Sequence, residues 1–159
     1  MAKNGKHGFW LSPLVYRECK VKRKAIFWKK YVIKNGYELI APLVYEDSLG
    51  RIHLRKKGYV WDGATKPFRL SSKSEERAML AASAIHDDFL GANIVYLDLD
   101  FKKQRKINIG IIEGARIMRD ALISKKYSKV KAWVVFFGIV LFQPFISIWG
   151  KDYPWIKKN

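Results

Sequence analysis

Hydrophobic and polar positions divide this chain into two halves with different periods. Before residue 60, short apolar and β-branched runs are interrupted by lysines and by turn-forming residues, as in half-buried strands. After residue 72, apolar residues recur every three or four positions, which is typical of helices. The pattern predicts an α+β fold, in which an N-terminal antiparallel meander is followed by about three helices.

Four segments carry the strand pattern in the first half. Pro13 makes Phe9–Tyr16 an edge strand or a packed loop, because proline cannot donate to a sheet ladder. A strand is predicted over Ala25–Ile33, and Asn35-Gly36 is a favourable two-residue hairpin turn leading into the next apolar run. Basic and apolar residues then alternate from Arg51 to Arg55, which predicts another strand.

The second half contains three predicted helices. The first covers Ser74–Leu90, with Ser72 and Glu75 placed to form a capping box at its start. The second is expected over Phe101–Ile123, and the third over residues 130–143.

The stretch Ala132–Gly150 carries no charge and has lysines and tryptophans at its ends. Such flanks are typical of membrane interfaces, whereas Gln143-Pro144 in the middle favours a core helix followed by an apolar tail. Within the core helix, the residues expected to face the second helix are Val134, Phe137, Val140 and Leu141.

The expected organisation is a flexible basic arm over residues 1–8, a single α+β domain over residues 9–144, and an aromatic and basic tail over residues 145–159. The tail is predicted to bind a partner or a membrane surface. Its proposed contact residues are Phe145, Ile148, Trp149, Trp155, Lys151, Lys157 and Lys158.

The formal net charge of +17 over 159 residues indicates an anionic partner, either DNA, an anionic membrane or an acidic protein, or else a solubilising surface. Because Cys19 is the single cysteine, no disulfide can form within the chain. The N-terminus lacks the apolar segment of a secretory signal, so we expect no secretion through such a signal.

Candidate chemistry centres on His86, near the end of the first predicted helix. A neutral histidine suits a general base, and Asp62, from the loop before that helix, is its first candidate partner. Asp87 and Asp88 are candidate ligands for a divalent cation such as calcium. The alternative is a structural His-Asp pair that locks the loop onto the helix.

Two short motifs, in this order and at this spacing, resemble the uncharacterised domain-of-unknown-function family 1353. The first is the loop Asp62-Gly63-Ala64-Thr65-Lys66-Pro67 and the second is the helix end with His86-Asp87. The family commonly has tyrosine after the His-Asp pair, where this chain has Phe89 and Leu90, and an Ala-Asp pair in its second helix, matched here by Ile107-Asn108.

That family is common in bacteriophages and prophages. The resemblance therefore implies a phage-associated protein, a virion, tail or lysis-linked binding component whose partners are other phage proteins. It also implies a location in the virion or in the host cytoplasm. Secreted phospholipases that place a His-Asp pair on a helix provide a local likeness, which leaves open a small hydrolase using His86 with Asp62.

Overall fold

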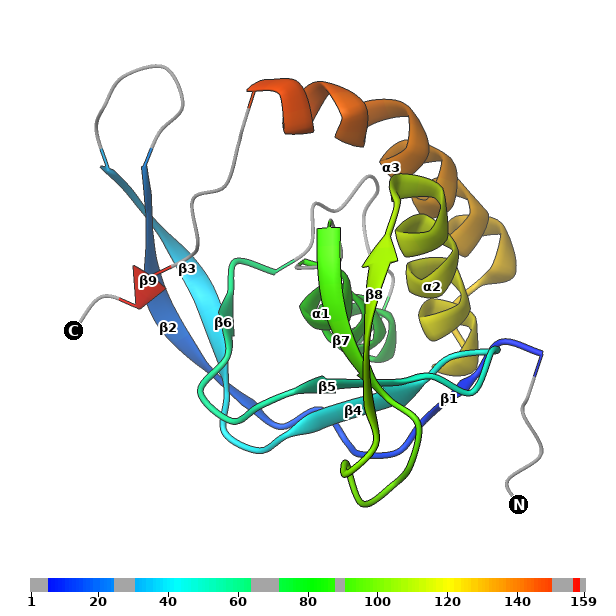
Figure 1. The fold of residues 1–159 in the computed structure, drawn as a ribbon. Helices are drawn as coiled ribbons and strands as arrows, with labels where there is room; N and C mark the ends of the chain where they lie inside the picture. Colours follow the sequence, from blue (N-terminus) through cyan, green and yellow to red (C-terminus); the bar gives the residue numbers. More distant parts are fainter. Residues whose placement is uncertain (1–5, 25–30, 64–71, 88–90, 150–155, 158–159) are drawn as a thin grey trace.

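The computed structural model describes residues 6–24, 31–63, 72–87, 91–149 and 156–157. For residues 23–24, 31–32, 91–92, 143–149 and 156–157 it describes the backbone alone. Within these residues the predicted α+β fold is confirmed (Figure 1). The elements are β1 Phe9–Trp10, β2 Tyr16–Lys24, β3 Tyr31–Leu39, β4 Leu43–Glu46, β5 Ile52–Arg55, β6 Val60–Trp61, α1 Lys73–His86, β7 Gly91–Tyr96, β8 Gln104–Ile109, α2 Ile111–Ser124, α3 Lys129–Trp149 and β9 Ile156–Lys157.

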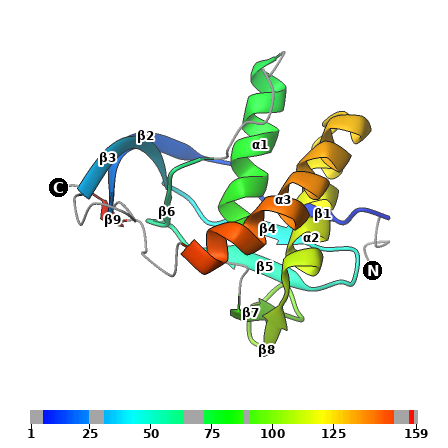
Figure 2. The same ribbon diagram turned by 90° about the horizontal axis from the view of Figure 1, so that it is seen from above.

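The strands form two antiparallel sheets. The five-stranded sheet has the order β1-β4-β5-β7-β8, and the four-stranded sheet has the order β6-β3-β2-β9. The long β2–β3 hairpin lies on the opposite side of the molecule from α2 in both ribbon views (Figures 1 and 2). As expected, Phe9 and Trp10 lie in an edge strand.

The hairpin turn predicted at Asn35-Gly36 is wrong. Both residues lie inside β3, where Asn35 pairs with Lys20 and Gly36 with Cys19. The glycine is required for packing: a Cβ on Gly36 would collide with the side chain of Val21 and lie 2.8 Å from the carbonyl oxygen of Trp61. Local turn propensity was therefore a misleading guide at a position where the backbone is closely covered.

The predicted second helix begins too early. Residues 104–109 form β8, which pairs with β7, so that only Ile111–Ser124 is helical. The carboxylate of Asp98 accepts hydrogen bonds from the amides of Lys102 and Lys103, and this closes the turn between the two strands. Asp98 therefore closes a turn between two strands, and Asn108 lies in a strand.

The core lies where α1 meets the sheets and α2. Helix α1 begins after Ser72, whose hydroxyl accepts a hydrogen bond from the Glu75 amide at 3.2 Å, as the sequence predicts. All residues from Ala78 to Ile85 are buried. Helix α2 packs against both α1 and α3, which gathers the three helices together (Figure 2).

Helix α3 differs from its prediction in length and in orientation. It continues past Pro144 to Trp149 and curves over the molecule (Figure 1). The side facing the protein contains Ala132 and Val135, which are buried, whereas Val134, Phe137 and Leu141 are exposed. Of the four residues expected to face the second helix, Val140 is partly buried beside the start of α2, and the other three were wrong. An almost wholly apolar helix gives no internal signal for which side packs inward.

Candidate functional site

His86 is the last residue of α1 and is partly buried. The eight residues that precede it in the helix, Ala78 to Ile85, are buried, so its backbone position is fixed by packing. The helix ends at His86, with Asp87 as the C-cap and the Asp87 amide donating to the carbonyl oxygen of Ser83 at 2.9 Å.

Arg55, at the end of β5, joins this helix end to the five-stranded sheet. Its Nε donates to the carbonyl oxygen of Ala84 at 3.1 Å, and its Nη2 donates to that of Ile85 at 2.7 Å. A guanidinium at this position satisfies carbonyl groups that the helix leaves without partners, and it complements the negative end of the helix dipole. Sequence reasoning treated Arg55 only as a residue of a strand and missed this role.

The environment of His86 disfavours its charged form. Burial lowers the pKa of the imidazole, the positive charge of Arg55 lowers it further, and the resulting pKa is about 4. At neutral pH the ring is therefore neutral. A base with a pKa this low binds a proton weakly at neutral pH, which is less effective for general-base catalysis than a pKa near 7.

Asp62 follows β6 and is partly buried. Gly63, the next residue, has a φ of +86°, and a Cβ there would lie 2.9 Å from Cε2 of Tyr37. The glycine thus allows both the turn and close packing on β3. The rest of the predicted loop, from Ala64 to Pro67, lies outside the described residues, and the pairing of Asp62 with His86 remains a prediction.

The predicted cation site at the helix end also remains a prediction. Asp87 is exposed, and Asp88 lies outside the described residues. Over the parts of the chain with described positions, no group of three or more histidine, cysteine, aspartate or glutamate side chains has an arrangement suited to holding a metal ion.

A His-Asp pair that sequence reasoning did not select joins Asp47, in the turn after β4, to His53 of β5. Nε2 of the buried His53 is 2.9 Å from Oδ2 of Asp47, and Nε of Arg51 donates to the same oxygen at 2.7 Å. Oδ1 of Asp47 accepts hydrogen bonds from the amides of Leu49 and Arg51. Arg51 also contacts Glu113 on α2 at 2.6 Å, so the network connects the turn to a helix.

The pKa values of this pair indicate a structural role. Burial lowers the pKa of His53 despite the nearby carboxylate. Burial alone would raise the pKa of Asp47, but the hydrogen bonds from His53 and the backbone, with the charge of Arg51, outweigh it and lower the pKa. A neutral His53 therefore donates from Nε2 to an ionised Asp47. The only sequence signal was a turn-forming aspartate followed by a basic strand.

The N-terminal arm also contacts the domain through its last residues. Nδ1 of His7 lies 3.1 Å from Oδ1 of Asp120 on α2, and the hydroxyl of Tyr45 donates to the carbonyl oxygen of His7 at 2.6 Å. These contacts fasten residue 7 between the five-stranded sheet and α2.

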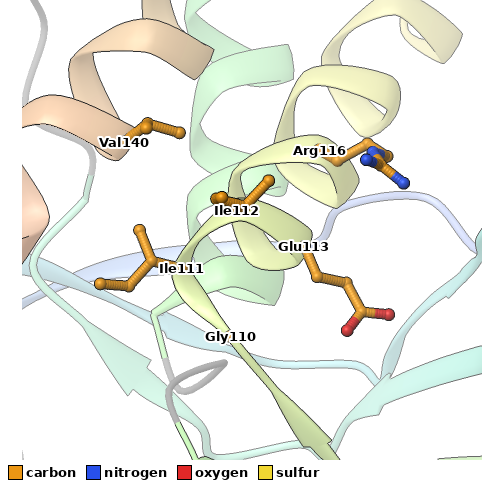
Figure 3. A pocket seen from close by; sticks show the side chains of 6 residues that line it. All are labelled: Gly110, Ile111, Ile112, Glu113, Arg116 and Val140. Atoms are coloured by element: carbon orange, nitrogen blue, oxygen red, sulfur yellow. The ribbon is translucent and has the colours of Figure 1, made fainter.

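A shallow groove runs between the start of α2 and α3. Ile111 and Val140 lie toward each other across it, whereas Glu113 and Arg116 project from the other side of α2 (Figure 3). Glu113 is paired with Arg51, and Arg116 is exposed with no ion pair to any residue that the structure describes. The groove thus has apolar walls, and the exposed charge of Arg116 lies on the adjacent side of α2 (Figure 3).

Helix α3 presents its largest apolar surface away from the protein. Five exposed residues, which we call the outer face of α3, form it: Val130, Trp133, Val134, Phe137 and Leu141. The guanidinium of Arg119 on α2 lies 4.3 Å from the centre of the Trp133 ring and is ion-paired with Asp120 at 2.7 Å.

Two residues of the predicted tail, 156 and 157, lie against the edge of the four-stranded sheet. Ile156 and Lys157 form β9, which pairs with Val21 and Lys22 of β2. Phe145, Ile148 and Trp149 belong to the last turns of α3, and their side chains are outside the described set. Lys151, Trp155 and Lys158 also lie outside it, so their proposed role in binding remains a prediction.

Comparison with known protein families, curated proteins and solved structures found no match. In the portion of the chain described by the structure, no helix has the length and apolar character needed to cross a membrane.

Proposed function

We propose that this chain is a phage-associated binding protein, a virion, tail or lysis-linked component that attaches to its partner through the outer face of α3. The phage assignment is supported by the resemblance of the loop around Asp62 and the helix end at His86 to family 1353. The binding assignment is supported by the exposed apolar surface of α3.

The outer face of α3 is the observation that carries the proposal. Soluble monomers seldom expose a contiguous apolar surface without using it, because water around such a surface is unfavourable. Phe137 is 54% exposed and Leu141 60%, although the opposite side of the same helix packs into the core. A bound partner would cover these apolar side chains and remove them from water.

The net charge supports the same reading. A chain with a formal charge of +17 attracts anionic partners over distances of about one Debye length, which is roughly 8 Å at physiological salt. Exposed Arg116, Lys126 and Lys129 lie on α2, on the α2–α3 turn and at the start of α3. Attraction and apolar burial can therefore act on the same side of the protein.

The competing function is a small hydrolase that uses His86 with Asp62. A pKa of about 4 leaves His86 neutral at neutral pH, as a general base must be, but makes it a weak proton acceptor. The same features suit a structural histidine at a helix end. We therefore favour binding over hydrolysis.

Mass spectrometry of purified particles tests the proposal. Particles of the phage or prophage that encodes this chain are purified on a density gradient, and host membranes are collected at the time of lysis. We expect the chain in the particles if it is a virion component, or in the membrane fraction if it is lysis-linked. Its absence from both, together with esterase activity of the purified protein that His86→Gln abolishes, would establish the hydrolase instead.

A further inference from the structure

We infer that the partner of the outer face of α3 is an anionic lipid bilayer, on which the helix lies parallel to the membrane surface. This inference rests on the proposed function, because it names the partner of the same binding surface. The outer face of α3 inserts into the region between the headgroups and the acyl chains of one leaflet.

The spacing of the outer face fits a surface helix. Its residues lie three, four, seven and eleven positions after Val130, which places them on one side of an α-helix. From Val130 to Leu141 the stripe extends over roughly 16 Å at the helical rise of about 1.5 Å per residue. The other side of α3 packs against α2, so one side is available to the bilayer and the other is held by the protein.

The chemistry of the stripe favours lipid over a protein partner. Protein interfaces carry about one hydrogen bond for every 100–200 Å², and they need polar side chains to make them. Trp133 has the one side-chain polar atom on the outer face, and its indole is of the kind that settles at the membrane interface. Valine, phenylalanine and leucine supply the rest, and acyl chains accept these without hydrogen bonds.

The charges around the stripe select an anionic membrane. The sequence of α3 contains no aspartate or glutamate, and the N-terminal end of the stripe carries Lys129 with Lys126 in the preceding turn. Arg119 covers the Trp133 ring at the side of the stripe, and Arg116 borders the groove next to it. Cations beside an apolar surface are the arrangement by which amphipathic helices bind anionic lipid.

Three nearby cations already have partners within the protein, so among the described residues the free cations of the border are Arg116, Lys126 and Lys129. Nη2 of Arg119 lies 2.7 Å from Oδ1 of Asp120. Nζ of Lys131 lies 2.8 Å from Oε1 of Glu75, and Nζ of Lys125 lies 4.8 Å from the centre of the Trp10 ring. A second copy of the chain is a poor occupant, because two molecules of formal charge +17 repel each other.

Vesicle binding of the full chain tests the inference. Partition onto vesicles of phosphatidylglycerol and phosphatidylcholine is measured by cosedimentation, with pure phosphatidylcholine vesicles as the neutral reference. We expect binding to the anionic vesicles that is at least about tenfold stronger than to the neutral ones, since each cation near the surface adds about one kcal/mol.

The decisive variant carries Phe137→Gln with Leu141→Gln. Both side chains are exposed, so circular dichroism is expected to show an unchanged fold, while partition falls about tenfold or more for each lost apolar anchor. The matched control carries Ile94→Gln with Leu97→Gln. These two residues are 56% and 52% exposed on the β7–β8 hairpin, and their replacement should leave partition unchanged.

Equal loss of vesicle binding in the two double variants would overturn the inference, as would no loss in either. The same holds if the wild-type chain fails to bind anionic vesicles, or if light scattering shows a dimer that Phe137→Gln with Leu141→Gln dissociates. Absence of the chain from both particles and membranes at lysis would overturn the proposed function alone. The vesicle experiment uses purified protein, so its result on lipid binding does not depend on where the chain is found at lysis.

Discussion

Replacing His86 with glutamine removes a titrating group from the end of α1 while keeping a polar side chain of similar length. In the unfolded chain the imidazole has an ordinary pKa of 6.5, and in the folded protein burial and Arg55 lower this pKa to about 4. Above pH 6.5 both states hold a neutral ring, and the full stability is present. Between the two values the unfolded state binds the proton first, so stability falls as the pH falls.

The size of this effect follows from the two pKa values. At a pH of about 4.5, the folded wild-type protein has lost about 2.5 kcal/mol of unfolding free energy through His86 alone, relative to its value at about pH 7.5. Below pH 4 this loss stops growing, because the folded state then binds the proton as well. His53 contributes in the same direction, since its pKa is also lowered. The comparison with the variant isolates the share of His86.

Urea unfolding followed by circular dichroism at the two pH values is the assay. We expect the wild-type chain to lose about 2.5 kcal/mol more on acidification than His86→Gln does. Carbon-13 labelling of the histidines gives the titration of His86 directly by NMR. The reasoning is wrong if both proteins lose the same stability, or if His86 titrates near 6.5 in the folded chain.

Three further changes test individual contacts. Asp62→Asn should lower the pKa of His86 further if the two residues are paired, since the carboxylate favours the imidazolium; an identical His86 titration by NMR would disprove the pairing. Asp47→Ala should lower the unfolding free energy by about 3–5 kcal/mol, because it leaves the buried His53, Nε of the partly buried Arg51 and two amides without their acceptor. A loss of less than about 1 kcal/mol in urea unfolding would contradict that role. Gly36→Ala should cost about 1–3 kcal/mol through its collision with Val21, and a thermal midpoint equal to that of the wild type would refute the packing argument.

Local chemistry was enough to predict several features of this protein. The fold class followed from the change of hydrophobic period near residue 60, and the start of α1 followed from the serine cap at Ser72. The edge position of Phe9 and Trp10 followed from Pro13, which cannot donate to a ladder. In each case neighbouring residues decide the outcome, so the sequence contains the whole cause.

Tertiary structure decided the features that depend on distant partners. Gly36 lies in a strand because β2 and the carbonyl of Trp61 cover it, and residues 104–109 form a strand because β7 pairs with them. The exposed side of α3 is set by the position of α2, since the helix is apolar on nearly all sides. The low pKa of His86 comes from its burial in the folded protein and from the charge of Arg55, which is far from it in the sequence. Neighbouring residues along the chain determine capping and periodicity, but burial and charge at a site depend on residues that only folding brings together.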